Sequence, residues 1–255
     1  AQELVAALNV DNKEKHDLLN ADIVKRAFWL FAQDNDPTYG GFSQAPKFPR
    51  PAVLQFLFNY YHLTGETKPR DMALHTLQKM AAGGVYDHLG GGFHRYSVDK
   101  RWFVPHFEKM LYDQSQLANV YLEAFLITED RHYSQIARQI FDYLLRDMLG
   151  PGGGFYSAED ADSQDPYSLG EHGEGAYYLW TEEDIIARLG KEDAALFTYS
   201  YGVRSGGNVS QDPLQEFTDR NILHRTHSSD EAAELFQMDR RAVERSLAES
   251  REILF

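Results

Sequence analysis

The stretch Gly91-Gly92-Phe93-His94 has two counterparts in this chain, Gly40-Gly41-Phe42-Ser43 and Gly153-Gly154-Phe155-Tyr156. Successive phenylalanines of this repeat are about 50 to 60 residues apart, which leaves room for two helices of ordinary length and their connections. The repeat therefore predicts successive helical hairpins whose three Gly-Gly-Phe loops lie on one face and form the functional surface.

The segments between these loops have the apolar spacing of helices. Expected helices cover residues 21–33, 51–63, 71–82, 111–127 and 133–149, and a last one begins near Asp239. Pro51 fits a first helical turn and Gly83 a helix end. Residues 111–127 are apolar on nearly every side, which predicts a fully buried helix, whereas 133–149 is amphipathic. This alternation favours two concentric layers of helices, and an ordinary helical bundle is the alternative.

The third loop is long and contains signals for short strands. We expect strands near residues 174–180 and 221–224, with a helix capped by Thr181 after the first of them. Pro105 is expected to begin a helix in the second loop region, which would place Glu108 and Asp113 in its first turns. Loops of such length are uncommon unless they bind something.

Composition limits the classes of function. The chain has 255 residues, 43% of them hydrophobic and 13% aromatic, so it has the material for a large core. Its formal net charge of −14 disfavours nucleic acid and anionic membranes as partners. The charge allows a neutral polar ligand such as a sugar, or a cationic one.

The chain contains no cysteine. Disulfides, zinc–thiolate sites and thiol catalysis are therefore excluded within it, and the composition suits a reducing, cytoplasmic location. No segment has the uninterrupted apolar length of a membrane span. The polar start, without an initiator Met, and the uncapped helical end suggest a piece of a longer protein.

The second loop region holds three histidines, His88, His94 and His106. Their spacing matches no common zinc pattern, and the chain has no thiolate to complete one. The alternative is that they form hydrogen bonds to the loop backbone. We predict neither a metal nor another cofactor.

Carboxylates in the second and third loops are candidates for acid–base chemistry, since cleavage of a glycosidic bond commonly needs two of them. We expect Glu108 and Asp113 to act as acid and base or to orient the ligand, with Asp160 and Asp162 opposite them. Two plainer readings stay open. Lys109 and Asp113 are spaced as an ion pair on a helix, and the acidic stretch of the third loop is typical of a solvated turn.

Other polar and aromatic side chains extend this site. In an epimerase, where a base removes the proton next to a carbonyl, His94 and His106 would transfer protons. Arg95 and Lys47 would stabilise a developing oxyanion. Flat rings would stack on a sugar, although aromatic packing within the loops is the alternative. The residues expected to contact the ligand are Lys47, Arg95, Tyr96, Trp102, Tyr112, Glu159, Asp160, Asp162 and Tyr178.

Longer strings within these loops resemble a known family. They are Gly41-Phe42-Ser43-Gln44-Ala45-Pro46-Lys47-Phe48-Pro49, His94-Arg95-Tyr96-Ser97-Val98-Asp99, Trp102-Phe103-Val104-Pro105-His106-Phe107-Glu108-Lys109-Met110-Leu111-Tyr112-Asp113 and Gly154-Phe155-Tyr156-Ser157-Ala158-Glu159-Asp160-Ala161-Asp162-Ser163. From about Asp22 to Phe255 the chain resembles the spermatogenesis-associated protein 20 family, whose bacterial members are usually called thioredoxin domain-containing proteins.

The resemblance implies a fold and partners. In that family a thioredoxin-like domain precedes a helical barrel similar to six-hairpin glycosidases and N-acylglucosamine 2-epimerases. It implies an all-α chain that forms the helical hairpins of an incomplete α/α toroid with short β-hairpins in its loops. Residues 1–20 would be a polar segment or linker, and residues 21–255 the partial barrel domain. The missing thioredoxin-like domain and barrel half would be its partners, and exposed apolar surface would favour self-association.

Two functions follow from these observations. The first is a carbohydrate-active barrel domain, glycosidase-like or sugar 2-epimerase-like, acting on a sugar-like small molecule. The second is a non-catalytic module that binds a ligand or client for the thioredoxin-like domain. The family that the chain resembles has no established reaction, so the resemblance assigns no proven catalytic residue to this chain. Similarity of fold alone does not determine function.

Overall fold

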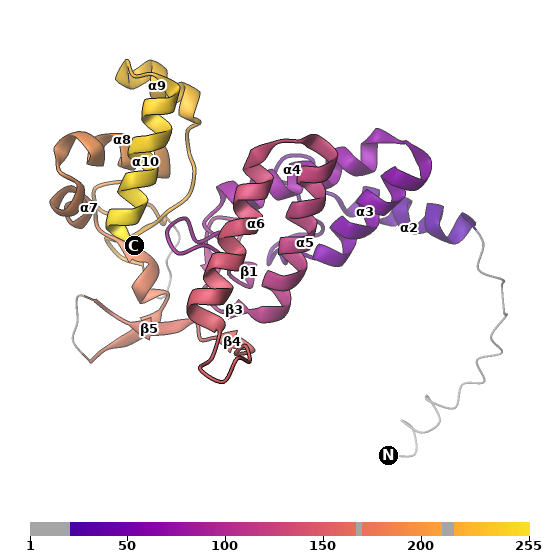
Figure 1. Cartoon of the computed structure of the whole chain (residues 1–255), viewed down its shortest axis with the longest axis horizontal. Coiled ribbons are helices and arrows are strands. Elements are labelled where there is room, and N and C mark those ends of the chain that lie inside the picture. The colour runs from indigo at the N-terminus through magenta and orange to yellow at the C-terminus, as the bar shows by residue number, and fades with distance from the viewer. Residues whose placement is uncertain (1–20, 167–169, 211–216) are drawn as a thin grey trace.

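Helices of two groups dominate the computed structural model, which describes residues 21–166, 170–210 and 217–255. Figure 1 shows the helices α2 to α6 in one group and α7 to α10 in the other, with short strands between them. The predicted all-α class, with helical hairpins and short β-ladders in the loops, is confirmed. The expected linker at residues 1–20 lies outside the described residues.

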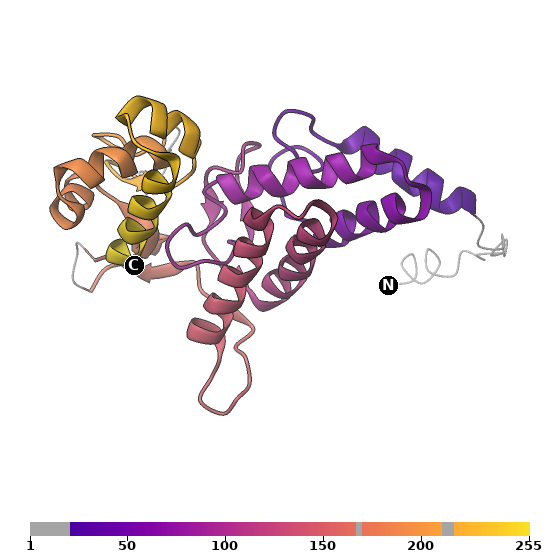
Figure 2. The same cartoon turned by 45° about the horizontal axis from the view of Figure 1, so that its top comes forward.

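The first group consists of one helix and two hairpins. Its elements are α2 (Ala21–Asp34), α3 (Pro51–Thr64), α4 (Thr67–Ala82), α5 (Leu111–Thr128), α6 (Arg131–Tyr143) and a π-helical turn, η1 (Leu144–Met148). Gly65 and Glu129, at φ 73° and 58°, end the first helix of each hairpin in the left-handed conformation. Helices α3 and α5 pack against each other, so the two hairpins lie side by side (Figure 2).

The second group contains α7 (Glu182–Leu189), α8 (Lys191–Tyr201), α9 (Ser229–Phe236) and α10 (Arg240–Leu254). The predicted cap at Thr181 is confirmed, since its side chain accepts a hydrogen bond from the Asp184 N–H. Ser228 and Glu231 form a reciprocal capping box at α9. Asp239 caps α10, where the last helix was expected.

Four antiparallel ladders connect the loops. They pair β1 (Tyr96–Ser97) with β2 (Pro105–His106), β3 (Lys109–Met110) with β4 (Ala158–Glu159), β5 (Asp162–Gln164) with β6 (His172–Glu174), and β7 (Leu179–Trp180) with β8 (Asn221–Ile222). A 3₁₀ turn, η2 (Ala176–Tyr178), precedes β7. Of the four ladders, the β3–β4 ladder fastens the second loop to the third.

Two sequence predictions about these elements are wrong. Pro105 begins strand β2 and not a helix, because residues 105–110 pair with neighbouring strands, so Glu108 precedes α5. Helix α5 is not buried all round, since Leu122 and Leu126 are 43% and 66% exposed. In addition, α4 begins at Thr67, earlier than expected.

The largest hydrophobic core joins α2 to α6, and it contains Phe42 and Phe93 without any exposed surface. A second core joins α7, α8, α9 and α10. A small third cluster, which includes Phe107, Leu179 and Ile222, lies among the ladders. None of the helices within the described ranges combines the length and the apolar character needed to cross a bilayer.

Replacing Gly91 by alanine is expected to destabilise the chain more than the same change at Gly153. Both glycines have positive φ, 78° and 81°, so alanine costs about 1 kcal/mol at either position. Only at Gly91 would the new Cβ lie 2.6 Å from a backbone oxygen, that of Gln139 in α6, whereas Gly153 has open space. We expect a loss of about 3 kcal/mol for Gly91→Ala in urea unfolding. Equal losses for the two variants would contradict this packing.

Candidate functional site

The first two Gly-Gly-Phe loops share a buried lysine–aspartate clamp. In the second loop, Lys109 Nζ donates to Asp87 Oδ2 at 2.7 Å and to the Gly91 carbonyl at 3.1 Å. Asp87 Oδ1 accepts from the backbone N–H groups of Leu89 and Gly90. Lys109 is 1% exposed, so its charge is balanced inside the protein.

Lys47 occupies the corresponding place in the first loop. Its Nζ donates to Asp36 Oδ2 at 2.7 Å and to the Gly40 carbonyl at 2.8 Å, and the side chain has no exposed surface. Asp36 Oδ1 accepts from the N–H groups of Thr38 and Tyr39. The predicted contact of Lys47 with a ligand is not possible in this arrangement, because its fully buried ammonium is held by Asp36 and Gly40 and lies over the rings of Tyr39 and Trp102.

The third loop lacks this clamp. Leu149 and Phe155 form the bridge that Asn35–Phe42 and Tyr86–Phe93 form in the other loops, so Gly150 stands where they have aspartate. Phe155 is 45% exposed, whereas Phe42 and Phe93 are fully buried. The three loops are therefore unequal, and the first two act as structural anchors around their phenylalanines.

A continuous chain of ionisable side chains lies on the other side of the second loop. Arg95 Nη1 donates to Glu108 Oε2 at 2.6 Å, and His106 Nε2 lies 3.8 Å from the same oxygen. His106 Nδ1 donates to Glu174 Oε1 at 2.7 Å. The side chains of these four residues are between 24% and 37% exposed.

The backbone explains this arrangement. Strand pairing sets Tyr96 opposite His106, and the Arg95 N–H donates to the Glu108 carbonyl at 2.8 Å. Alternation along residues 108–110 then directs Glu108 to the opposite side from Lys109. Glu174 arrives at the end of β6 and also accepts from the Phe107 N–H at 3.3 Å.

Asp113 is the unusual group beside this chain. It lies in the first turn of α5, is 7% exposed, and its Oδ2 has no hydrogen-bond partner among the described residues. Arg95 Nε is likewise buried without a partner there. Burial raises the pKa of Asp113 to about 6, with the charge of Glu108 adding to the shift and that of Arg95 opposing it. Near neutral pH this carboxyl can therefore either donate or accept a proton.

We call Arg95, His106, Glu108, Asp113 and Glu174 the Arg95–Asp113 cluster. Rings that a ligand can reach border it. Tyr112 is 47% exposed, and Tyr96 stacks on His106 at 4.9 Å between ring centroids and also packs on Phe48. The cluster thus combines a carboxyl that titrates near neutrality, a guanidinium–carboxylate pair and open aromatic faces.

The acidic third loop lies near the start of α5. Pairing of β3 with β4 sets Met110 opposite Ala158, and the Leu111 N–H donates to the Ser157 carbonyl at 3.0 Å. Asp160 and Asp162 follow and are exposed, with Asp160 Oδ1 accepting from the Asp162 N–H. Their predicted place opposite Glu108 and Asp113 stays a prediction.

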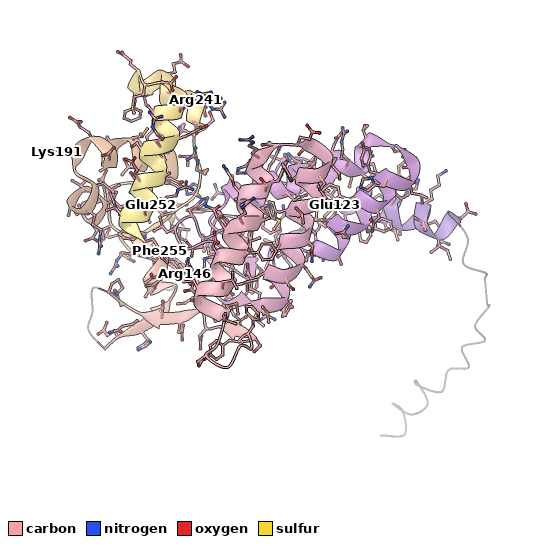
Figure 3. The ribbon with its side chains drawn as sticks, in the orientation of Figure 1. Glu123, Arg146, Lys191, Arg241, Glu252 and Phe255 are labelled. Atoms are coloured by element: carbon pink, nitrogen blue, oxygen red, sulfur yellow. The ribbon has the colours of Figure 1, made fainter. Side chains whose placement is uncertain are left out.

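Glu159, Tyr178 and His94 belong to a different, more buried network. Glu159 accepts from the hydroxyls of Tyr143 and Tyr178 at 2.5 and 2.8 Å, and Lys109 Nζ lies over both rings. Burial and two acidic neighbours raise the pKa of Tyr178 well above its usual range. His94 and Tyr178 also line a cavity of about 390 Å³ between the second loop and α10. Figure 3 labels Arg146 and Phe255 at this junction, where the guanidinium lies 4.3 Å from the ring centroid.

The three histidines of the second loop region do not form one cluster. His88 Nε2 donates to the Gly83 carbonyl and His94 Nδ1 to the Phe107 carbonyl, both at 2.9 Å, so the alternative of backbone hydrogen bonding is confirmed for these two. Burial lowers the pKa of each to about 3, so both are neutral at physiological pH. The described part of the chain contains no group of three histidine, aspartate or glutamate side chains placed to hold a metal ion.

Trp102 lies in the core and not at a ligand surface. It is fully buried, its Nε1 donates to the Tyr39 carbonyl at 2.9 Å, and its ring packs on Gly41. Of the predicted residues, the structure therefore brings Arg95, Tyr96, His106, Glu108, Tyr112 and Asp113 together at one surface.

Sequence reasoning counted Glu174 among the loop carboxylates that are candidates for acid–base chemistry, but it did not place this residue beside His106. It gave no role to Asp87, which bonds to Lys109. The plainer alternative for this region, an ion pair between Lys109 and Asp113, is wrong, because Lys109 pairs with Asp87. A signal for the clamp was present, because Asp36 and Asp87 stand at the same distance before their Gly-Gly-Phe motifs. No comparable signal linked His106 to Glu174, since only the β5–β6 hairpin brings them together.

Comparison with known proteins gives clear relatives in sequence. No family model matches the chain. Human spermatogenesis-associated protein 20 is 43% identical over 92% of the chain, and its mouse counterpart is 42% identical over 92%. An uncharacterized Caenorhabditis elegans protein is 38% identical over 94%. The chain spans only 32% to 35% of the length of these relatives.

Among solved structures, a sugar epimerase from a ruminal bacterium covers 91% of the chain with a TM-score of 0.49 and 15% identity, and the match covers 70% of that structure. Cellobiose 2-epimerase from Bacillus thermoamylovorans gives 0.48 and 12% identity, with the same coverage of both chains. A family 76 mannosidase from Bacteroides thetaiotaomicron gives 0.40 and 16% identity over 60% of the chain and 39% of its own. This likeness concerns the course of the helices and says nothing about the site.

Proposed function

The chain belongs to the spermatogenesis-associated protein 20 family, and on that premise we propose that it is part of a carbohydrate-active barrel domain in which the Arg95–Asp113 cluster transfers protons on a sugar-like ligand. One observation carries the proposal. A nearly buried carboxyl, Asp113, lacks a hydrogen-bond partner for one oxygen among the described residues and has a pKa near 6. General acid–base groups work best when their pKa lies near the operating pH.

The two carboxylates are suited to different roles. Glu108 accepts a charge-assisted hydrogen bond from Arg95, whereas Asp113 is held by burial in a setting that favours the protonated form. Two carboxyl groups in such different environments are the arrangement that acid–base pairs use. Asp113 would act as the acid and Glu108 as the base or nucleophile.

Two reactions fit these roles. In glycoside hydrolysis, protonated Asp113 gives its proton to the leaving glycosidic oxygen while Glu108 activates water or attacks the sugar carbon. In 2-epimerisation, a base removes the proton next to the open-chain carbonyl and a proton returns to the opposite face. His106, hydrogen-bonded to Glu174, is then the second proton-transfer group.

The surrounding groups support a sugar over other neutral ligands. Tyr96 and Tyr112 offer ring faces on which the C–H side of a pyranose can stack. The guanidinium of Arg95, whose side chain is 37% exposed, is placed to donate to a hydroxyl or to a developing oxyanion. The net charge of −14 agrees with a ligand that carries no phosphate at this acidic site.

A substrate screen tests the proposal. The chain and, in parallel, full-length human spermatogenesis-associated protein 20 are incubated in D₂O with glucose, mannose, N-acetylmannosamine and gluco- and manno-disaccharides. Proton NMR detects deuterium entering at C2 for epimerisation and new reducing ends for hydrolysis. We expect one of these signals, and we expect Glu108→Gln to abolish it in the chain.

The second candidate, a ligand-binding module without catalysis, gives a different result. Saturation-transfer NMR would then detect sugar binding, with neither deuterium incorporation nor cleavage, and binding would persist in Glu108→Gln and Asp113→Asn. This outcome would remove the acid–base assignment and keep the ligand surface.

A further inference from the structure

A second pocket, separate from the Arg95–Asp113 cluster, is lined by positively charged side chains. Lys79 at the end of α4, Arg101, Arg204 and Arg225 surround a cavity of about 310 Å³. His224 completes the basic set. None of the described residues that line this cavity is an aspartate or a glutamate.

In the part of the chain that the structure describes, the four cations lack the carboxylate partners that several other basic residues have. Arg50, Arg95, Arg146, Arg220 and Arg240 each form an ion pair with a carboxylate. Across residues 21–166, 170–210 and 217–255, no such pair involves any of the four pocket cations. Because like charges around one cavity repel each other, an anion that enters the cavity would be attracted by all four.

The acidic residue whose charge acts on His224 is already engaged. Asp99 accepts from the backbone N–H groups of Arg101 and Val104, both at 2.6 Å, and so shapes the loop that carries Arg101. Its oxygens are therefore occupied by the backbone and do not pair with the pocket cations.

The cations are held by the backbone and by aromatic rings. The Arg204 N–H donates to Asn221 Oδ1 at 2.8 Å, and Asn221 Nδ2 donates back to the Arg204 carbonyl at 3.1 Å. The Arg225 N–H donates to the Ala82 carbonyl at 2.7 Å, and its guanidinium lies over Tyr201. Arg101 lies over Phe103. Stacking on rings limits the freedom of a guanidinium and so lowers the cost of ordering it around a ligand.

We propose that this basic pocket binds the phosphate group of a small phosphorylated molecule. Guanidinium groups match phosphate oxygens in bidentate geometry, and three arginines and one lysine line this cavity. The volume is at the low end for small-molecule sites, about 300–1,000 Å³, which suits a phosphate with a small polar body. Tyr39, which is half-buried, also lines the wall of the cavity.

The pocket lies between the two groups of helices. Lys79 and Arg101 belong to the first group, whereas Arg204 follows α8 and Arg225 follows β8. A bound phosphate would therefore hold these groups together by its charge. A ligand in the basic pocket would not contact the acid–base site, because no residue of the Arg95–Asp113 cluster lines this pocket.

Titration calorimetry of the chain with inorganic phosphate, glucose 6-phosphate and glucose tests this inference. We expect both phosphates to bind and glucose not to bind here, with affinity falling as salt rises from about 50 to 200 mM. Arg101→Gln and Arg204→Gln should each weaken glucose 6-phosphate binding about tenfold or more, because each removes charge-assisted hydrogen bonds. Both side chains are exposed, and circular dichroism checks that the variants fold.

Arg241→Gln is the matched control, since it removes the same charge from the exposed start of α10 (Figure 3). The affinity of this variant for glucose 6-phosphate should stay within about twofold of that of the unchanged chain. Absence of phosphate binding at millimolar concentration, or equal weakening by Arg241→Gln and Arg101→Gln, would overturn the proposal. Binding of a single-stranded oligonucleotide without binding of the monophosphates would also overturn it. Glu108→Gln should leave phosphate binding intact, which separates this test from that of the acid–base site.

Discussion

Replacing Asp87 by alanine is expected to lower the free energy of unfolding by about 3–5 kcal/mol, because it leaves the ammonium of Lys109 buried without its partner. Lys109 is 1% exposed and Asp87 Oδ2 lies 2.7 Å from its Nζ. The change also removes the acceptor for the N–H groups of Leu89 and Gly90. Urea unfolding followed by circular dichroism measures the loss.

Asp36→Ala is the matched control, since it cuts the equivalent clamp in the first loop, where the aspartate is 22% exposed and water can reach the vacated place. We expect a smaller loss there. In the double variant Asp87→Ala/Lys109→Met, part of the stability should return, because no buried charge remains. A loss below about 1 kcal/mol for Asp87→Ala would show that the clamp is not a structural anchor.

The same pair gives a pH dependence with a defined sign. Burial alone would raise the pKa of Asp87, but the charge and hydrogen bond of Lys109 and the field of His94 lower it overall. A carboxyl with a lowered folded pKa adds stability above its unfolded pKa of about 3.9, and this contribution is lost as the pH falls through the folded value. The stability difference between the unchanged chain and Asp87→Ala should therefore be constant from pH 5 to 7 and shrink below about pH 4.

Asp113→Asn is expected to lower turnover by about 10²–10⁴-fold on whichever sugar the screen identifies, since general acid–base groups contribute rate factors of that size. The loss should appear in kcat, because asparagine retains the shape and some hydrogen-bonding capacity of the side chain. Glu252→Gln, an exposed change on α10 labelled in Figure 3, removes a carboxylate outside the site and should leave turnover unchanged.

The same substitution, Asp113→Asn, should raise the free energy of unfolding at neutral pH although it lowers turnover. Its pKa is raised to about 6, so ionisation in the folded chain is unfavourable. Between about pH 4 and 6 the folded state binds more protons than the unfolded state, and stability falls as the pH rises. Asp113→Asn should therefore be more stable than the unchanged chain at pH 7, on the order of 2 kcal/mol, and similar to it at pH 4. A purely structural aspartate would instead lose stability on this change at pH 7.

The positions of several helices could be predicted because residues at the helix starts signal them in the local sequence. Pro51 begins α3, and Thr181 and Asp239 cap α7 and α10 where they were expected. The ladders at residues 105–110 could not be recognised in the same way. Strands of two residues show no periodicity, and their pairing partners come from the third loop. For that reason Pro105 was assigned to a helix that does not begin until Leu111.

The site was predictable where it lies within one stretch of chain. Arg95, His106 and Glu108 are neighbours in the second loop, and the β1–β2 ladder needs only that loop to assemble them. Burial of Lys47 depends on Asp36 in its own loop, for which the spacing before the Gly-Gly-Phe motif was an unused signal. Burial of Trp102 was not predictable, because it depends on the Tyr39 carbonyl in a different loop. The basic pocket was hidden for the same reason, since its cations are spread from Lys79 to Arg225.

The most direct test of the central claim is the pKa of the Asp113 carboxyl in the folded chain. Carbon-detected NMR of aspartate-labelled protein over pH 3 to 8, with Asp113→Asn to assign the signal, measures it without knowledge of the substrate. A titration midpoint near 6 is the predicted result, together with a shift of that midpoint towards lower pH in Glu108→Gln, because the carboxylate charge beside it is gone. A midpoint below about 4, the range of an ordinary aspartate, would contradict the assignment of Asp113 as the proton-transfer group of this site.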